Sequence, residues 1–217
     1  MGDGAVVTLA AFVAGWTTLA APSLVPEIRL YLATELTPLW QATEEVLASR
    51  GVPPPYWAFA WPGSQALARH VLDGGLDVRG RRVLDFAAGS GLAAIACAMR
   101  GAAVEAAEID AFARAAIAAN AAANGVAVAI PEADVVGEEG GWDVVLAGDV
   151  FYEKPMAARI LPWLRWLARR VPVLIADPGR AFVPREGLET LASYVVPTTL
   201  ELEDRAERQV TIARLLP

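Results

Sequence analysis

Short apolar runs and amphipathic stretches alternate along most of the chain. The apolar runs predict seven strands, at Arg82–Phe86, Val104–Ile109, Val126–Pro131, Trp142–Ala147, Val171–Ala176, Tyr194–Leu202 and Gln209–Leu215. The other stretches predict helices at Gln65–Leu72, Leu92–Met99, Ala111–Asn124, Pro155–Arg170 and Gly187–Ser193. Because strands that alternate with helices form parallel sheets covered on both faces, we expect an α/β fold, a doubly wound and mostly parallel seven-stranded sheet. The last two strands have no helix between them, which predicts an antiparallel C-terminal hairpin.

The residues before this region predict an extension that precedes the sheet. Leu24–Ser49 has apolar residues at helical spacing, although Pro26 and Pro38 limit or interrupt a helix there. A proline-rich run then stops any helix. We therefore expect an N-terminal helical extension over residues 1–55 and one α/β domain over residues 56–217.

The first residues do not resemble a secretion signal. A signal peptide begins with a positively charged region, whereas the first basic residue of this chain is Arg29. The mildly apolar stretch Ala5–Ala21 is interrupted by Gly15, Thr17 and Thr18, which argues against a spanning helix. We expect a cytoplasmic protein without a membrane partner.

Charge and composition narrow the classes of function. The 217 residues carry 18 Lys and Arg against 25 Asp and Glu, a net charge of −7. Because no basic patch is available to contact phosphates, we expect no nucleic-acid partner. The chain has one cysteine, Cys97, and one histidine, His70, so it can form neither an internal disulfide nor an ordinary zinc site. We expect both side chains to be structural and no metal to be bound.

A turn with two glycines follows the first predicted strand of the sheet. The run Asp85–Gly91 contains Gly89 and Gly91 directly before a predicted helix. Such glycines let a ligand approach the N–H groups at the start of a helix, although a tight structural turn needs them equally. The run lacks the third glycine of a dinucleotide-binding fingerprint, and no P-loop is present. The glycines alone leave a ligand site and a structural turn open.

Acidic residues stand at or just beyond the carboxyl ends of four successive predicted strands, as Asp85, Glu108, Asp134 and Asp149. Because ligands of doubly wound sheets bind beyond the carboxyl ends of the strands, we expect these carboxylates to surround one site. Glu108, 23 residues after Asp85, stands where a carboxylate can accept hydrogen bonds from a ribose diol. Helix capping explains any one of these residues well but accounts poorly for all four.

Several of these stretches resemble a known enzyme family. Val83–Gly91 and the later Glu108-Ile109-Asp110 resemble the cofactor loop and ribose carboxylate of seven-strand S-adenosylmethionine-dependent methyltransferases, with Ala87 where the first glycine is usual. Trp61–Arg69 and Asp149-Val150-Phe151-Tyr152 resemble the family-16 branch of protein lysine methyltransferases. Within that branch, the chain is most similar to electron transfer flavoprotein β-subunit lysine methyltransferases.

The resemblance implies a Rossmann-like methyltransferase fold that binds S-adenosylmethionine and releases S-adenosylhomocysteine. The cofactor contacts that it implies are Trp61, Asp85, Ala87, Gly89, Gly91, Glu108, Ile109, Asp134, Val135 and Asp149. Asp85 would hold the amino group of the cofactor, Glu108 its ribose hydroxyls, and Asp134 its adenine amino group. Val135 would lie on the adenine ring, and Trp61 would close over the cofactor unless it is a core aromatic residue.

The resemblance also implies Asp149 and Tyr152 as catalytic residues. A lysine amine has an ordinary pKa of ~10.4 and must lose its proton before it can attack a methyl group. Asp149 and Tyr152 are placed to accept hydrogen bonds from that amine, and Phe151 is a candidate for lining its channel. A plain cap for the helix that begins near Pro155 is the alternative for Asp149.

The sequence leaves three functions open. The first is methylation of a protein lysine, with the electron transfer flavoprotein β subunit as substrate, and the acidic net charge suits a basic protein surface. The second is methylation of a small amine such as nicotinamide. The third is a non-catalytic module that retains the cofactor site. We expect the first, carried out by a monomer.

Overall fold

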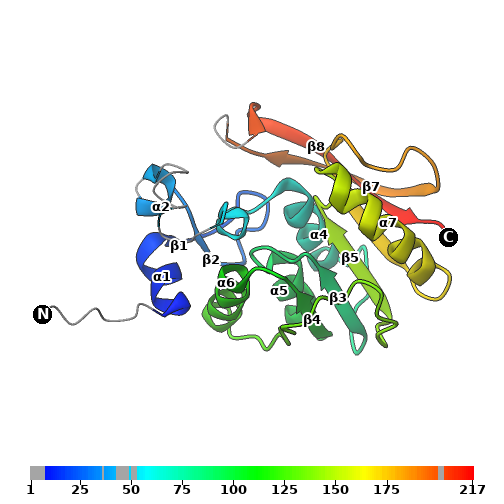
Figure 1. Ribbon diagram of the computed structural model, residues 1–217, viewed down its shortest axis with the longest axis horizontal. Coiled ribbons are helices and arrows are strands. Elements are labelled where there is room, and N and C mark those ends of the chain that lie inside the picture. Colours follow the sequence, from blue (N-terminus) through cyan, green and yellow to red (C-terminus); the bar gives the residue numbers. More distant parts are fainter. Residues whose placement is uncertain (1–7, 36, 43–48, 50–52, 200–202) are drawn as a thin grey trace, which may run out of the picture.

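The computed structural model describes residues 8–35, 37–42, 49, 53–199 and 203–217 of the chain (Figure 1). Its helices are α1 (Leu9–Trp16), α2 (Pro38–Gln41), the 3-10 turn η1 (Tyr56–Ala58), α4 (Pro62–Leu72), α5 (Leu92–Met99), α6 (Ala111–Ala123) and α7 (Lys154–Ala168). Its strands are β1 (Thr18–Ala20), β2 (Leu30–Leu32), β3 (Arg82–Phe86), β4 (Ala103–Ala107), β5 (Val144–Gly148), β6 (Val173–Asp177), β7 (Leu188–Pro197) and β8 (Glu207–Leu215).

The central sheet has the strand order β4-β3-β5-β6-β8-β7. Strands β4, β3, β5 and β6 are parallel, whereas β8 is antiparallel to both of its neighbours. Every residue of β6 is buried, as expected for a parallel strand that has helices on both faces. The expected α/β fold, with a mostly parallel sheet and antiparallel C-terminal strands, is confirmed.

Two of the expected elements differ from the structure. Val126–Pro131 contributes only an isolated bridge between Ala129 and Glu105, so the sheet has six strands in the part of the chain that is described. This segment lies at the β4 edge with its alternate residues partly exposed, and Pro131 has no N–H to extend the ladder. The helix expected at Gly187–Ser193 is wrong, because Leu188–Ser193 belong to β7, which pairs with β8.

The helix expected over Leu24–Ser49 is also wrong where the structure describes it. This segment holds β2 and the short α2, while residues 43–48 lie outside the described residues. Its backbone bonds instead to an asparagine of α6 and to the residue that caps this helix. The Tyr31 N–H donates to Asn120 Oδ1 at 2.7 Å, and the Arg29 N–H donates to Asn124 Oδ1 at 2.9 Å. These side chains satisfy backbone groups that a helix would otherwise pair internally.

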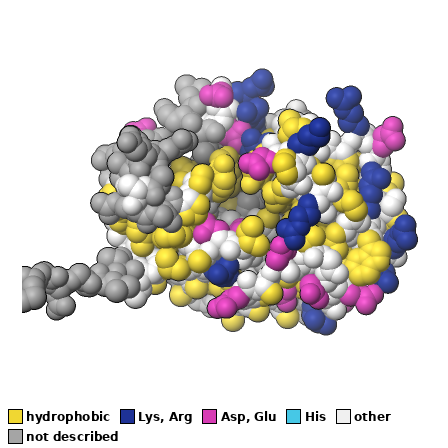
Figure 2. Space-filling model, viewed as in Figure 1, with side chains coloured by type: hydrophobic (Ala, Val, Ile, Leu, Met, Phe, Trp, Pro, Cys, Tyr) yellow, Lys and Arg dark blue, Asp and Glu magenta, His cyan; other side chains and the backbone are white. Residues whose placement is uncertain are grey.

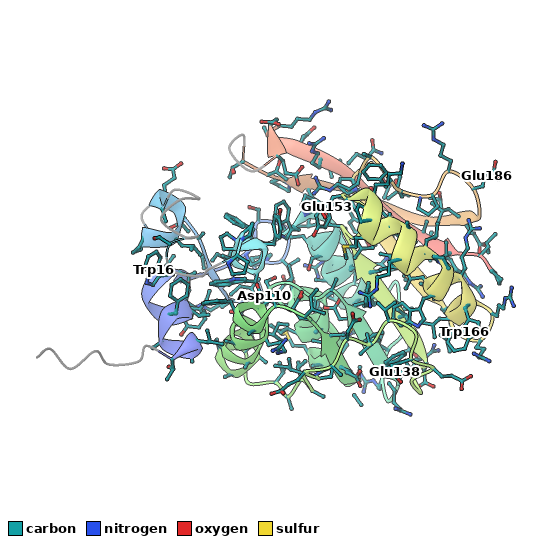
Figure 3. All side chains as sticks on the ribbon, viewed as in Figure 1. Trp16, Asp110, Glu138, Glu153, Trp166 and Glu186 are labelled. Atoms are coloured by element: carbon teal, nitrogen blue, oxygen red, sulfur yellow. The ribbon has the colours of Figure 1, made fainter. Side chains whose placement is uncertain are left out.

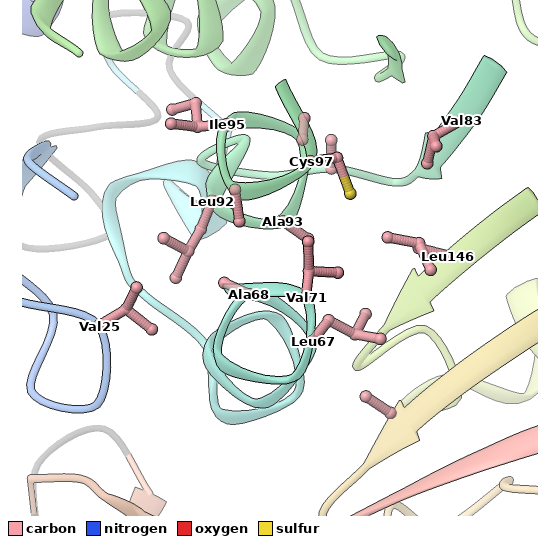
Figure 4. Packing of buried hydrophobic residues seen from close by; sticks show 14 of the residues in the cluster. Val25, Leu67, Ala68, Val71, Val83, Leu92, Ala93, Ile95, Cys97 and Leu146 are labelled. Carbon is pink, nitrogen blue, oxygen red and sulfur yellow. The ribbon is translucent and has the colours of Figure 1, made fainter. Parts of the chain in front are cut away.

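The extension packs onto the domain and contributes to its core. Helix α1, which lies within the expected helical extension, begins at the Thr8 cap and lies against α6 (Figure 1). On one face of the sheet, α4 and α5 bury apolar side chains such as Leu67 and Leu92, together with Val25 from the extension (Figure 4). Cys97 is buried in the same cluster.

Helix α7 covers the opposite face of the sheet, where Trp163 packs edge-on against Phe86 at 5.1 Å between ring centroids. The two apolar clusters thus hold the sheet between helical layers and fix the carboxyl ends of its strands. No helix among the described residues has the length and apolar character needed to cross a bilayer.

Candidate active site

A cavity of about 750 Å³ opens at the carboxyl ends of β3, β4 and β5. Hydrophobic side chains surround the hollow on the face shown in Figure 2. Asp110 and Glu153, which line the cavity, mark the starts of α6 and α7 in Figure 3. Most of the residues implied by the resemblance line it, namely Trp61, Ala87, Gly89, Glu108, Ile109, Asp134, Val135, Asp149 and Tyr152. Asp85 and Gly91 do not.

The turn between β3 and α5 shapes one wall of the cavity. Ala87, Gly89 and Gly91 all have left-handed backbone conformations, with φ of 53°, 54° and 76°. The left-handed conformation favours glycine at position 91, where a Cβ would also lie 3.1 Å from the side chain of Ile117, a tight contact. Ala87 adopts the left-handed conformation in spite of its Cβ, at a cost of about 1–2 kcal/mol.

Asp85 lies behind this turn. Its Oδ2 accepts a hydrogen bond from the N–H of Ala94 at 2.9 Å and so serves as a cap for α5, whose cap residue, Gly91, has no side chain. Complete burial raises the pKa of Asp85 to about 7. Asp85 also borders a second, much smaller cavity together with Trp61 and Gly89.

Glu108 joins the end of β4 to the glycine turn. Its Oε2 accepts from the Gly89 N–H at 3.1 Å, and its Oε1 accepts from the N–H groups of Ile109 at 2.8 Å and Asp110 at 3.3 Å. Burial raises the pKa of Glu108 in spite of these three contacts. Beside it, Ile109 is 70% exposed, although it is a large apolar residue at the cavity wall. A ligand in the cavity would cover this side chain.

Asp134 is already engaged by a basic residue. Arg159 of α7 forms an ion pair with its Oδ2, and the Val136 N–H donates to its Oδ1 at 3.0 Å. Partial burial alone would raise the pKa of Asp134, but these two contacts hold it below its ordinary value. Val135, next in the chain, is buried and lines the cavity.

Asp149 is held from two sides at the end of β5. Its Oδ2 accepts from the Gly63 N–H at 2.6 Å, at the start of α4, and its Oδ1 accepts from Arg180 at 2.8 Å. The residue is buried and has a φ of 57°. Burial raises the pKa of Asp149 to about 6, against the opposing effect of the Arg180 charge. Asp149 therefore caps α4, and not the helix near Pro155 that the sequence offered as an alternative.

Aromatic rings form the rim of the cavity near Asp149. The ring centroids of Tyr152 and Tyr56 are 5.8 Å apart, and those of Tyr56 and Trp61 are 6.0 Å apart. The indole N–H of Trp61 donates to the Tyr56 carbonyl at 2.7 Å, which fixes the orientation of the indole. Tyr152 is 40% exposed at this rim. Phe151, in contrast, is completely buried in the core beside α7, so the expectation that it lines a substrate channel is wrong.

Sequence reasoning missed Arg180 and Glu203 as parts of this site. Asp177 Oδ1 accepts from the N–H groups of Gly179 and Arg180, which brings the Arg180 side chain back to Asp149. Nothing local in the sequence predicts a contact across 31 residues. His70, as expected, has a structural contact, with the Tyr194 hydroxyl at 3.0 Å.

Comparison with solved structures shows the fold. Magnesium protoporphyrin IX methyltransferase from Synechocystis, in a structure with bound S-adenosylmethionine, superimposes with a TM-score of 0.53 at 16% sequence identity. The match covers 70% of this chain and 77% of that chain. A family model described as "Methyltransferase small domain" matches residues 60–151, which include most of the cavity residues.

Comparison with curated proteins shows the family. The electron transfer flavoprotein beta subunit lysine methyltransferase of Xenopus laevis is 41% identical, over 78% of this chain and 70% of the relative. The Danio rerio protein of the same name is 37% identical, over 84% of this chain and 73% of the relative. The expected S-adenosylmethionine-dependent methyltransferase class is confirmed. This chain belongs to the family of electron transfer flavoprotein β-subunit lysine methyltransferases.

Proposed function

We propose that this enzyme transfers a methyl group from S-adenosylmethionine to a lysine side chain of the electron transfer flavoprotein β subunit. The relatives that carry this name match the chain at 33–41% identity. The observation that carries the proposal is the position of Asp149. This buried carboxylate lies in the wall of the same cavity as Glu108, beneath an exposed aromatic rim.

The residues around the cavity fit S-adenosylmethionine. Glu108 presents a carboxylate for the ribose hydroxyls, and Ile109 and Val135 present apolar surface for the adenine ring. The glycine turn brings backbone close to the methionine part, with Asp85 behind it. Asp134 reaches the adenine edge only in competition with Arg159, its present partner. When bound, S-adenosylmethionine supplies a methyl group from its sulfonium sulfur and leaves as S-adenosylhomocysteine.

Asp149 and Tyr152 then act on the lysine. The carboxylate and the phenol oxygen accept hydrogen bonds from the amine and fix its direction of approach. The apolar rings of Tyr56 and Trp61 shield the aliphatic stem from water. A neutral amine is favoured over an ammonium in such a setting, because burial disfavours the charged form.

The exposed rim favours a protein substrate over a small amine. Tyr56 and Tyr152 are 48% and 40% exposed, so the cavity mouth presents apolar surface that a docked protein would cover. A nicotinamide-sized substrate would leave these rings in water. We propose in addition that residues 1–55 act as an extension of the catalytic domain 56–217, and that the enzyme is a cytoplasmic monomer without a nucleic-acid or membrane partner.

A labelled-methyl assay tests the proposal. Purified electron transfer flavoprotein and nicotinamide are offered in parallel with labelled S-adenosylmethionine, and heat-denatured flavoprotein serves as the matched control. We expect label on a lysine of the native β subunit, located by mass spectrometry. Label on nicotinamide alone would establish the small-amine function. Bound cofactor without label on either acceptor would refute the substrate assignment and favour a non-catalytic module or another protein acceptor.

A further inference from the structure

Arg180 is shared between two buried carboxylates. Its Nη2 donates to Asp149 Oδ1 at 2.8 Å and also to Glu203 Oε1, and its Nη1 donates to Glu203 Oε2 at 3.2 Å. Glu203 in turn forms an ion pair with Arg208 at 2.9 Å. The four side chains form a continuous charged chain from the cavity to the β7–β8 hairpin.

Burial makes this chain of charges energetically significant. The side chains of Glu203 and Asp149 are 1% and 9% exposed, and that of Arg180 is 19% exposed. Removing one partner from a buried ion pair is strongly destabilising, because the other charge stays buried without compensation. Glu203 and Asp149 therefore hold the Arg180 guanidinium between them.

The hydrogen bonds leave Asp149 with one position for a further donor. A carboxylate has about four acceptor positions, two on each oxygen. Arg180 Nε and Nη2 both donate to Oδ1, and the Gly63 N–H donates to Oδ2. Three positions are thereby filled, and the fourth lies on Oδ2.

We propose that Arg180 is a positioning residue for methyl transfer, which holds Asp149 by Oδ1 and leaves an acceptor position on Oδ2 for the substrate amine. Glu203 acts through Arg180. It holds the guanidinium in place, and it neutralises part of the guanidinium charge, so that Arg180 does not fully neutralise the negative charge of Asp149. The inference deepens the proposed function and rests on it, because that function gives Asp149 its contact with the amine.

The electrostatics of the site support this arrangement. The groups that face the Asp149 carboxyl are the Gly63 N–H from α4, Asp177 at the end of β6, and Arg180, with Glu203 behind it. Arg180 is the one cation among them and opposes the effects of burial and of Asp177 on the pKa of Asp149. Loss of Arg180 therefore raises the pH at which Asp149 ionises.

Three variants test the proposal: Arg180→Met, Glu203→Gln and the double variant. Two controls, Arg205→Met and Glu207→Gln, alter exposed residues of the same hairpin. Cofactor binding is measured by calorimetry with S-adenosylhomocysteine, and kcat by methylation of the β subunit between pH 6 and pH 9. We expect Arg180→Met to retain cofactor affinity within about threefold and to lower kcat about 100-fold at pH 7. The pH at which kcat falls on acidification should move to a higher value in this variant. Glu203→Gln should lower kcat about tenfold in the parent and less than about twofold in Arg180→Met.

An NMR titration of the Asp149 carboxyl carbon gives a readout without substrate. Its midpoint should rise in Arg180→Met and stay unchanged in both controls. An unchanged midpoint, a kcat within threefold of the parent, or equal effects of Glu203→Gln in both backgrounds would overturn the proposal. If the parent enzyme does not methylate the β subunit, the proposed function fails, and the titration still decides the role of Arg180.

Discussion

Replacement of Glu108 by alanine is expected to weaken cofactor binding by a predictable amount. Backbone N–H groups fill three of the roughly four acceptor positions of this carboxylate. The two hydroxyls of a ribose need two positions, so one present contact must be released. The contact from Asp110, at 3.3 Å, is the longest of the three.

The expected loss of binding free energy follows from the hydrogen bonds that are gained and released when the ribose binds. Two hydrogen bonds to a carboxylate contribute about 4.5 kcal/mol, and the released backbone contact offsets about 1.5 kcal/mol of it. The remaining ~3 kcal/mol corresponds to about a 150-fold increase in the Kd of Glu108→Ala. Because burial raises the pKa of Glu108, the affinity of the parent should also fall on acidification at a pH above that of an ordinary glutamate.

Calorimetric titration with S-adenosylhomocysteine measures the effect. Glu189→Ala, an exposed glutamate on β7, is the matched control, and the thermal midpoint of each variant checks that it is folded. A Kd for Glu108→Ala within threefold of the parent would refute the assignment of the ribose contact. A loss shared equally by Glu189→Ala would show that net charge, and not the contact, is responsible.

Three further predictions concern the strand ends. Asp149→Asn should retain cofactor binding and lower the single-turnover rate by about 10²–10⁴-fold, and an unchanged rate would remove Asp149 from catalysis. Because the pKa of Asp85 is about 7 in the folded state and lower when unfolded, the folded state binds more protons between pH 4 and pH 7, so stability falls as pH rises through that window. At about 1.4 kcal/mol per pH unit this amounts to at most ~4 kcal/mol, and urea unfolding of Asp85→Asn should show a flatter pH dependence. Ala87→Gly removes the strain of an alanine in the left-handed conformation and should raise the free energy of unfolding by up to about 1 kcal/mol. A free energy of unfolding below that of the parent would contradict the assigned strain.

The strands that form the parallel sheet were predictable because their apolar runs are short and mostly buried. The errors occur where tertiary contacts override local preference. The segment before α4 has apolar residues at helical spacing, yet Asn120 and Asn124 bind its backbone. Residues Leu188–Pro197 form a strand because β8 pairs with them along their length.

In the candidate site, too, residues at strand ends were predictable, and residues that depend on tertiary contacts were not. Glu108 and Asp149 were predictable because each follows a strand, and the topology brings strand ends together. Their roles in binding and catalysis stay predictions. Glu203 was not predictable, since its contact with Arg180 spans 23 residues and depends on the pairing of β8 with β6. No spacing rule connects these two positions.

Strand β8 follows β7 in the sequence but lies between β6 and β7 in the sheet (Figure 1). During synthesis, β3 and β4, which lead to Gly89 and Glu108, emerge before β5, β6 and β8, and β3 gains its second neighbour when β5 arrives. The edge of β6 stays open until β8 arrives, and an unpaired edge is a template for association with other chains. Only then does Glu203, just before β8, reach Arg180. A nascent chain would therefore gain the glycine turn and Glu108 well before it gains the contact that holds Arg180.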